Sequence, residues 1–394
     1  MKLSLGAATS AVRAGIASDR QHGAVIPPIH LSSNFTFSGY GGKRQYDYTR
    51  SGNPTRDVLA SALSDLEGGA GAVVTSSGIA ALTLLTQLLK PEDLLIAPHD
   101  CYGGTFRLLE YLASRGSFRV RFVDQTNAAD LRMAAMDRPR LVLVETPSNP
   151  LLRVVDLRAM SRLAKAQGAL LAVDNTFLSP ALQNPIAHGA DLVVHSTTKY
   201  INGHSDVVGG ALVAATSELA TELCDLANCL GLTGAPFDSY LTMRGLRTLQ
   251  VRARQHEANA QQIAEMLLRH PIVAKVCYPG LDTHPGHEIA KRQQRGFGGM
   301  LSFELVGDER TVIAFVESLR LFSLAESLGG VESLVCHPQS MTHAPLSDED
   351  LQTAGISKQL IRLSVGIEDV DDLSADILNA LAMAANATKS CAVL

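Results

Sequence analysis

Short apolar runs alternate with segments of helical periodicity along the first two thirds of the chain. The apolar runs predict buried strands over 72–75, 94–97, 120–123, 141–144, 170–173, 192–195 and 208–214. The intervening segments predict helices over 56–67, 78–89, 104–114, 156–167 and 217–229. Because strands that alternate with helices pair side by side in the same direction, the pattern predicts an α/β fold with a mostly parallel sheet.

The two ends of the chain depart from this alternation. Residues 1 to about 60 contain turn-forming pairs such as Pro27-Pro28, which interrupt each periodic segment before it could bury a face. We predict an arm there (1–60), although a loop-rich cover on the chain's own core fits the composition equally well. After a helix-rich stretch over 240–270, strand patterns near 296–304 and 362–366 predict a smaller α/β domain. The predicted boundary near residue 255 gives a large domain over 61–255 and a C-terminal domain over 256–394.

The composition is that of an ordinary globular protein. The chain has 394 residues, of which 46% are hydrophobic and 19% charged, and its formal net charge is -5. Because no basic stripe stands out, the charge pattern argues against binding to nucleic acid or to an anionic membrane. No uncharged apolar run approaches membrane-spanning length, and the first residues are too short an apolar segment for a signal peptide.

Six cysteines are scattered along the chain without any Cys-x-x-Cys pair. This usage fits reduced thiols better than a disulfide framework, so we predict a cytoplasmic protein. No metal site is expected, since the segment from His284 to His287 contains helix breakers and lacks the order of a zinc-binding helix.

The stretch from Asp191 to Asp206 contains the first candidate site. A short apolar strand over 192–194 is followed by Ser196, Thr198 and Lys199, which therefore lie at its carboxyl end, where α/β sheets bind ligands. Two hydroxyls beside one lysine make a plausible anion cradle with an amine at its edge. Alone this signal is weak, because a lysine after a strand is usually a solvated loop residue.

An acidic residue at the end of the preceding strand strengthens the signal. The apolar run over 170–173 ends in Asp174, which alone could be a helix cap or a turn former. Pyridoxal phosphate requires a lysine for its aldehyde, a carboxylate for its protonated ring nitrogen and a cup for its phosphate. Asp174 and Lys199 meet the first two needs, and backbone N–H groups of Gly78 and Ile79 at a helix N-terminus would provide part of the cup. A Ser-Ser helix cap without a ligand is the alternative for that last segment.

The run from Ser196 to Asp206 resembles the cofactor-lysine signature of the Cys/Met-metabolism pyridoxal-phosphate enzymes, the cystathionine synthase and lyase family. Similar stretches recur over nearly the whole chain, at 27–29, 48–54, 100–105, 145–150 and 325–332. The resemblance implies pyridoxal 5'-phosphate as cofactor and an aspartate-aminotransferase-like fold (fold type I). It also implies a homo-oligomer, a tetramer built from dimers.

The resemblance assigns roles around the cofactor. Tyr48 and Arg50 have the chemistry to bind a phosphate, and by resemblance they reach the cofactor phosphate of a neighbouring subunit, so that a dimer is the minimal active unit. Tyr102 would stack on the pyridine ring and take part in proton transfer, with core packing as the alternative. Asn149 would lie near the ring oxygen or the substrate carboxylate; without the resemblance, its segment is simply a turn.

A second group of residues is expected to bind amino-acid substrates. Arg362 is the candidate for the α-carboxylate, since a guanidinium can hold it with two hydrogen bonds; an exposed strand arginine is the alternative. Ser327 would support Arg362, and Glu326 would point toward a second amino group at the distal end of the substrate. Three further cations could meet the carboxylate of a succinyl ester, although solvation is their commoner fate: Lys43, Arg44 and Arg107.

Within this family the chain most resembles the bacterial cystathionine γ-synthases. The implied reaction is γ-replacement on an O-acylhomoserine, O-succinyl-L-homoserine above all, by L-cysteine to give L-cystathionine, in the transsulfuration route of methionine biosynthesis. Lys199 would carry protons in this reaction. Gly104 stands where the methionine γ-lyases carry Cys, which weighs against that activity.

One departure keeps other activities open. The γ-synthases tend to carry a second Arg at the position of Ser51, whereas the γ-lyases carry Ser there. Cystathionine γ-lyase is therefore the first alternative, and O-acylhomoserine sulfhydrylase the second. A catalytically silent assembly subunit is the non-enzymatic alternative, but the retained Lys199 and Asp174 argue against it.

Overall fold

The computed structural model describes residues 5–342, 344 and 348–391. Its larger sheet has seven strands in the order β1-β7-β6-β5-β4-β2-β3. The strands are β1 (Gly71–Thr75), β2 (Leu94–Pro98), β3 (Arg119–Val123), β4 (Leu141–Glu145), β5 (Leu170–Asp174), β6 (Leu192–His195) and β7 (Gly210–Ala214). All pairs from β3 to β6 are parallel, and β7 is antiparallel to both of its neighbours. The prediction of a mostly parallel sheet is confirmed.

Helices cover both faces of this sheet, because its strands are apolar on both sides. Leu141 and Leu143 of β4 belong to a core cluster with α3, α4 and α8, whereas Val142 and Val144 belong to a cluster with α5 and α6. This period-two division is the one expected for a strand between two helical layers. The helices are α3 (Gly78–Thr86), α4 (Gly103–Ser114), α5 (Ala128–Ala135), α6 (Leu157–Gln167) and α8 (Ser217–Leu230).

The remaining helices of this part include α2 and α9, which form one core cluster with residues of β1, β6 and β7. Their bounds are α1 (Ala7–Val12), α2 (Pro54–Glu67), α7 (Ser179–Leu182), α9 (Pro236–Leu246) and a 3-10 turn over Pro185–His188. Helix α2 begins sharply because Asn53 accepts N–H groups of Thr55 and Arg56 while Pro54 occupies the first helical position.

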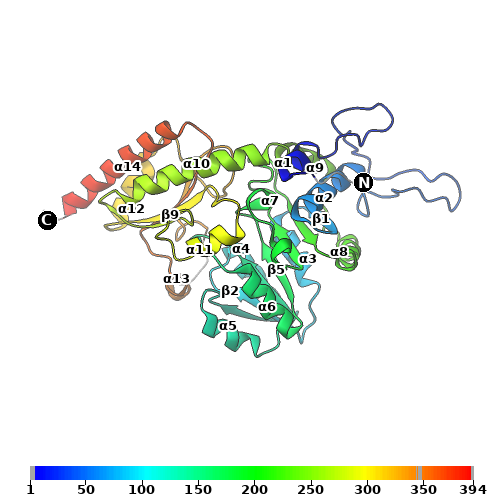
Figure 1. Cartoon of the computed structure of the whole chain (residues 1–394), viewed down its shortest axis with the longest axis horizontal. Coiled ribbons are helices and arrows are strands. Elements are labelled where there is room, and N and C mark those ends of the chain that lie inside the picture. Colours follow the sequence, from blue (N-terminus) through cyan, green and yellow to red (C-terminus); the bar gives the residue numbers. More distant parts are fainter. Residues whose placement is uncertain (1–4, 343, 345–347, 392–394) are drawn as a thin grey trace.

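A second sheet lies in the C-terminal part, in the order β10-β11-β12-β9-β8. Its strands are β8 (Val273–Cys277), β9 (Met300–Leu305), β10 (Ser323–Leu324), β11 (Leu334–Cys336) and β12 (Leu360–Ser364). Its helices are α10 (Leu249–Leu268), α11 (His287–Gln293), α12 (Glu309–Ser318), α13 (Asp348–Ala354) and α14 (Val370–Cys391). Figure 1 shows α10 and α14 as long helices over this part of the molecule.

Helix α10 is continuous across the predicted domain boundary at residue 255. It contacts β8, β9 and α14 of the C-terminal part, and also α1 and α7. The division into 61–255 and 256–394 therefore stays a prediction, with a shared helix where a linker would be expected.

The predicted arm over 1–60 contains a helix that the sequence did not indicate, α1, which packs on α2 and α10. Between α1 and α2 the chain forms loops that extend away from the body of the molecule, drawn in dark blue in Figure 1. These loops expose large apolar side chains, including Val25, Leu31, Phe37 and Tyr40. Exposed apolar groups in this number are typical of a surface that another protein chain covers.

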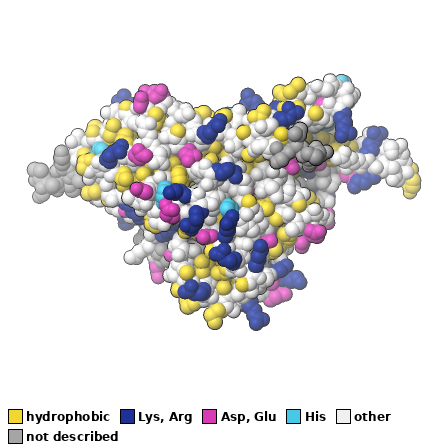
Figure 2. All heavy atoms as spheres, viewed as in Figure 1, with side chains coloured by type: hydrophobic (Ala, Val, Ile, Leu, Met, Phe, Trp, Pro, Cys, Tyr) yellow, Lys and Arg dark blue, Asp and Glu magenta, His cyan; other side chains and the backbone are white. Residues whose placement is uncertain are grey.

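The surface carries both signs of charge. In Figure 2, Lys and Arg side chains lie among Asp and Glu side chains on the face shown. No helix in the described ranges is both long and apolar enough to cross a membrane. Within the same ranges, no group of three or more His, Cys, Asp or Glu is arranged to hold a metal ion.

Candidate active site

A cavity of about 380 Å³ lies at the carboxyl edge of the larger sheet. Strands β4 and β5 end there at Glu145 and Asp174, which are paired in register, and β6 leads to the Lys199 turn. Segments of the C-terminal part complete the wall. The predicted site residues that line the cavity are Gly78, Ile79, Tyr102, Asn149, Asp174, Ser196, Thr198, Lys199, Glu326, Ser327 and Arg362.

Lys199 extends from a turn that follows β6. Its Nζ donates a hydrogen bond to Ser327 Oγ at 2.7 Å. Burial and the nearby Arg362 cation lower the pKa of Lys199 to about 8, although the Glu326 carboxylate acts in the opposite direction. The amine is thus far closer to its neutral, nucleophilic form at pH 7 than an exposed lysine is.

The turn that carries Lys199 requires glycine at position 203. The Gly203 N–H donates to the Lys199 carbonyl at 2.8 Å, and the φ of Gly203 is +72°, in the left-handed region. A Cβ there would lie 2.1 Å from Nη1 of Arg252, which itself donates to the Tyr200 carbonyl at 2.7 Å. Arg252 on α10, which does not line the cavity, therefore fixes this turn from the interior.

Asp174 lies at the end of β5, beside the Lys199 turn. Burial raises the pKa of Asp174, and hydrogen bonds from Thr176 lower it; the Thr176 N–H donates to Asp174 Oδ1 at 3.0 Å. Behind this strand end, the buried Glu67 accepts a hydrogen bond from Nε2 of His195 at 2.7 Å. A carboxylate in such surroundings suits a positively charged partner such as a protonated ring nitrogen.

Helix α3 begins at the cavity. Its N-cap, Ser77, accepts the N–H of Ala80 at 3.1 Å, which leaves the first N–H groups, those of Gly78 and Ile79, without an intrahelical acceptor. A Cβ at position 78 would lie 2.8 Å from Cβ of Ser196, so glycine lets the two segments approach closely. The helix dipole favours an anion at this point.

The two predicted cup hydroxyls differ. The Thr198 hydroxyl donates to the Gly209 carbonyl at 3.1 Å and accepts the Gly209 N–H at 3.0 Å, so it is already bonded on both sides. Ser196 donates its own N–H to Thr176 Oγ1 at 2.9 Å, which orients the segment toward α3. An amine, a carboxylate and a helix N-terminus with hydroxyls nearby are the donor set for an aldehyde, a pyridine nitrogen and a phosphate. The residues present fit pyridoxal phosphate.

Arg362 of β12 is buried in the opposite wall, with 2% of its surface exposed. Its Nη1 donates to Asn149 Oδ1 at 2.8 Å and its Nη2 to the Ser327 carbonyl at 2.9 Å. The Nε is buried and has no partner in the part of the chain that the structure describes. Ser327 holds a strained backbone with φ of 88°, which directs its carbonyl to Arg362 while its hydroxyl meets Lys199.

Tyr102 lies at the N-cap of α4 and exposes 39% of its surface. Its ring lies over Gly104, where a Cβ would come within 2.4 Å of the ring. A cysteine at position 104 would therefore displace the tyrosine ring.

Several lining residues were missed by the sequence reasoning. They are Ser77, Leu82, Thr105, Glu145, Pro147, Thr176, Phe177, Val208, Leu328 and Thr342. Glu145 had a usable signal, because it ends an apolar run just as Asp174 does. Burial raises the pKa of Glu145 well above its usual range, and the Asp174 charge raises it further, whereas the Tyr102 N–H lowers it.

Two predicted site residues, Tyr48 and Arg50, do not line the cavity of their own chain. They lie in the extended loops before α2, where Tyr48 is 50% exposed and Arg50 Nε donates to Asn228 Oδ1 at 3.2 Å. The three cations considered for a succinyl carboxylate are also outside the cavity and exposed: Lys43, Arg44 and Arg107. Lys43 forms an ion pair with Asp47 at 2.9 Å.

A lysine and a carboxylate at adjacent strand ends, beside a helix N-terminus, define the class of pyridoxal-phosphate enzymes with the aspartate-aminotransferase-like fold. The chain belongs to the Cys/Met metabolism PLP-dependent enzyme family, whose pattern matches residues 8–382. Pyridoxal phosphate is accordingly its cofactor, as the sequence predicted.

Individual relatives match this chain over nearly its whole length. Cystathionine γ-synthase of Escherichia coli (strain K12) is 58% identical over 373 residues, 94% of this chain and 97% of that protein. A solved cystathionine γ-synthase from Xanthomonas oryzae pv. oryzae, in complex with aminoacrylate and cysteine, is 59% identical with a TM-score of 0.97, covering 98% of this chain and 100% of that one. Cystathionine γ-lyase of Dictyostelium discoideum is 48% identical over 374 residues, 95% of this chain and 97% of that protein.

Proposed function

We propose that this enzyme catalyses γ-replacement on an O-acylhomoserine, O-succinyl-L-homoserine in the first place, by L-cysteine. The C–O bond at the γ-carbon breaks and a C–S bond forms, so that L-cystathionine and the released carboxylate are the products. The observation that carries the proposal is the cavity in which Lys199, Asp174 and Arg362 face a common space, in a chain 58% identical to a cystathionine γ-synthase. The reaction would serve methionine biosynthesis by transsulfuration.

The larger sheet would hold the cofactor. Lys199 would bind it covalently, Asp174 would keep the ring nitrogen protonated, and the N-terminus of α3 with Ser196 would hold the phosphate. The Thr198 hydroxyl would join them by exchanging the Gly209 carbonyl for a phosphate oxygen. When bound, the cofactor withdraws electrons from the substrate α-carbon. Supporting this assignment, these residues come from adjacent strand ends and share one cavity.

The C-terminal wall would bind the amino acid. Arg362 is already oriented by Asn149 and by the Ser327 carbonyl, and its Nε keeps a free donor for the α-carboxylate among the described contacts. A fixed guanidinium fork is well suited to a carboxylate. Glu326 also lines the cavity and would meet the distal amino group of cystathionine.

Lys199 would also move protons. A pKa near 8 means that a substantial fraction of its Nζ is neutral near pH 7.5, so it can accept the α-proton of the substrate and return protons to carbon. The Ser327 hydroxyl, 2.7 Å away, would orient the amine between these transfers. Tyr102 would cover the reacting face and keep water out.

We further propose a homo-oligomer, a tetramer built from dimers, in the cytoplasm. Tyr48 and Arg50 lie on loops that extend from the body and expose apolar side chains. This supports a contact with a neighbouring subunit, in which the two residues would reach the cofactor phosphate. The described cysteines, Cys101, Cys224, Cys229, Cys277 and Cys336, are all free thiols. Free thiols, some exposed, suit a reducing compartment.

Cystathionine γ-lyase is the second candidate, and Ser51 is the observation that favours it. The Ser51 hydroxyl lies within hydrogen-bond distance of Asp47 Oδ1 at 2.8 Å and the Tyr48 carbonyl at 2.7 Å, next to the residues proposed to reach the neighbouring subunit. A second arginine at that position would add a cation that could bind the carboxylate of an acyl group. This chain has Ser51 there and therefore lacks that cation.

Steady-state kinetics would separate the two candidates. With purified, cofactor-loaded enzyme, we expect kcat/KM for O-succinyl-L-homoserine with L-cysteine to exceed that for cystathionine cleavage at least about tenfold, a difference of about 1.4 kcal/mol in transition-state stabilisation. A clear preference for cleavage would overturn the synthase assignment in favour of the lyase.

A further inference from the structure

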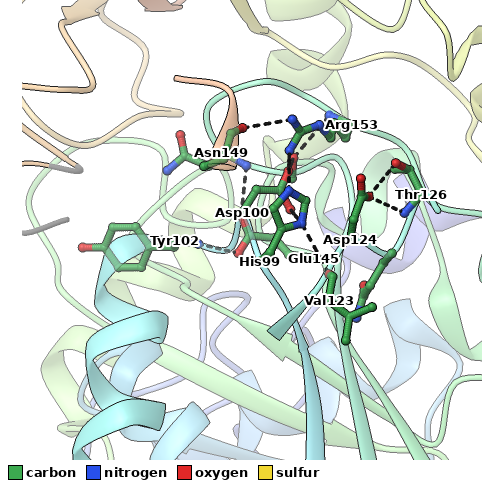
Figure 3. Close-up of polar contacts among 12 residues, drawn as sticks. His99, Asp100, Tyr102, Val123, Asp124, Thr126, Glu145, Asn149 and Arg153 are labelled. Atoms are coloured by element: carbon green, nitrogen blue, oxygen red, sulfur yellow. Dashed lines mark hydrogen bonds and ion pairs between the residues drawn. The ribbon is translucent and has the colours of Figure 1, made fainter. Parts of the chain in front are cut away.

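Glu145 is a buried carboxylate at the cavity to which the proposed reaction gives no role. It ends β4 and is 7% exposed. Each of its two oxygens accepts one backbone N–H: Oε2 that of Tyr102 and Oε1 that of Asn149, both at 3.0 Å. Figure 3 shows the side chains of Tyr102 and Asn149 extending to the same side of Glu145.

The two N–H groups belong to segments with different tasks. Tyr102 begins α4 and places an aromatic ring in the cavity wall. Asn149 accepts Nη1 of Arg362 at 2.8 Å and thereby orients the guanidinium. One carboxylate therefore connects the segment that carries the ring with the segment that orients the proposed carboxylate-binding group.

A second carboxylate, on the segment after β2, connects the same two segments. Asp100 follows β2, and its Oδ2 accepts the Ser148 hydroxyl at 2.7 Å and Nη1 of Arg153 at 2.8 Å. Thus Glu145 at the end of β4 contacts the segment that follows β2, and Asp100 after β2 contacts the segment that follows β4. We call the set of residues that makes these contacts the cross-brace: Asp100, Tyr102, Glu145, Ser148, Asn149 and Arg153.

The two carboxylates differ in their charge compensation. Asp100 forms an ion pair with Arg153, whereas Glu145 has no cation within ion-pair distance among the described residues. Burying a carboxylate without a cation is costly unless hydrogen bonds offset the cost. A glutamine at this position would avoid the charge but has a single acceptor oxygen for two N–H groups. The geometry therefore requires a carboxyl group, which presents one acceptor oxygen to each N–H.

We propose that Glu145 is a positioning residue that holds the Tyr102 ring and the Asn149–Arg362 pair at one fixed spacing. The inference rests on the proposed function only in taking Arg362 as the group that binds the substrate carboxylate. Glu145 acts through the two backbone segments, and it need not touch substrate itself.

The test compares Glu145→Gln with a matched control, Asp376→Asn. Asp376 on α14 is also 7% exposed and also accepts two backbone N–H groups, those of Arg320 at 3.0 Å and Leu321 at 2.9 Å, but it does not line the cavity. Hydrogen–deuterium exchange of the cofactor-loaded enzyme would follow peptides over 99–106 and 146–152. Binding of an unreactive amino acid would be titrated by the visible absorbance of the cofactor.

We expect Glu145→Gln to speed exchange in both peptides and to raise the Kd of the amino acid about tenfold, which corresponds to the loss of one buried hydrogen bond. Asp376→Asn should do neither. Because Glu145 acts through Asn149, its effect on the Kd should largely vanish in an Asn149→Ala background. If Glu145→Gln does not fold, Glu145→Asp takes its place, because its shorter side chain cannot reach both N–H groups.

Unchanged exchange and unchanged Kd in the Glu145 variant would overturn the proposal, as would a full effect in the Asn149→Ala background. Failure of the proposed function would look different. In that case the wild-type enzyme would make no cystathionine, while the exchange measurement would still report whether Glu145 holds the two segments.

Discussion

Arg252 and Arg362 are both almost fully buried, at 4% and 2% exposure, and neither forms an ion pair with a described residue. Their hydrogen bonds differ. Arg252 uses all of its nitrogens: Nε donates to Thr248 Oγ1, Nη1 to the Tyr200 carbonyl, and Nη2 to the carbonyls of Ile201 and Gly245. Arg362 uses its two terminal nitrogens and leaves Nε without a described partner.

The difference separates a structural cation from a functional one. A buried guanidinium whose donors are all bonded, mostly to backbone carbonyls, stabilises the loop that supplies these carbonyls. One that lines a cavity and keeps a donor free is ready for an anion from solution. Arg362 lines the cavity and Arg252 does not, so substitutions on the cavity side should change chemistry, and those on the interior side should change stability.

The largest effect is expected on the cavity side, for Lys199→Ala. This variant removes the proposed covalent anchor and the proton carrier together, so kcat should fall by about 10⁴-fold or more, since proton transfer alone contributes about 10²–10⁴-fold. Borohydride reduction of the wild type should attach the cofactor to the peptide that contains Lys199. Trapping at another lysine, or residual activity near that of the wild type, would remove the basis of the proposed function.

The next effect is expected for Arg362→Lys, which keeps a positive charge but loses the planar fork. Removing one side of a buried, hydrogen-bonded charge pair costs about 2–5 kcal/mol, so kcat/KM should fall by roughly 30- to 5,000-fold, mainly through KM. The urea midpoint of unfolding should change little. A large loss of stability without a change in KM would make Arg362 a structural cation like Arg252.

For Arg252→Met we expect the opposite result, a loss of stability with little change in activity. Carbonyl groups of Tyr200, Ile201 and Gly245 would lose their buried donor, and each unsatisfied group costs about 1–3 kcal/mol. We expect the free energy of unfolding to fall by about 3 kcal/mol in urea titrations, with kcat reduced less than about tenfold in the folded protein. Unaltered stability would contradict the structural assignment.

The strand ends of the site could be predicted from sequence because they follow apolar runs. Asp174 and Lys199 each come directly after or close behind such a run, and in a parallel sheet those ends meet at one edge. The helix α5 was missed, since it is short and only Asn127 marks its start. The helix expected over 78–89 ends at Thr86, after which the N–H of Gln87 bonds to the Leu84 carbonyl in a tighter turn.

The residues of the C-terminal wall of the cavity could not be predicted from local sequence patterns. Ser327 meets Lys199 across 128 positions of sequence, and Arg362 meets Asn149 across 213. No periodicity encodes such contacts, so only the family resemblance pointed to these residues. The same holds for Arg252, which the sequence reasoning did not consider, because three of its four partners are backbone carbonyl groups, which carry no sequence signal.

The smallest expected effect concerns His256, which lies on α10 one turn from Arg252 and forms an edge-on contact with the Tyr200 ring at 5.2 Å. Burial lowers the pKa of His256 to about 4, the Arg252 cation contributes in the same direction, and the hydrogen bond with the Val365 carbonyl opposes them. An unfolded histidine has its ordinary pKa near 6.5. Between about pH 6.5 and pH 4, the unfolded chain therefore binds more protons at this position than the folded protein does.

It follows that the contribution of His256 to stability is present above pH 6.5 and is lost as the pH falls toward 4. From pH 7 to pH 5 the free energy of unfolding should fall by about 2 kcal/mol more in the wild type than in His256→Gln, which does not titrate. If Arg252 is a cation that acts toward the interior, Arg252→Met should reduce this difference, because the pKa of His256 would then lie closer to 6.5. If this difference in the pH dependence of the free energy of unfolding is the same with and without Arg252, burial alone holds His256 neutral. The Arg252 charge would then not act on His256.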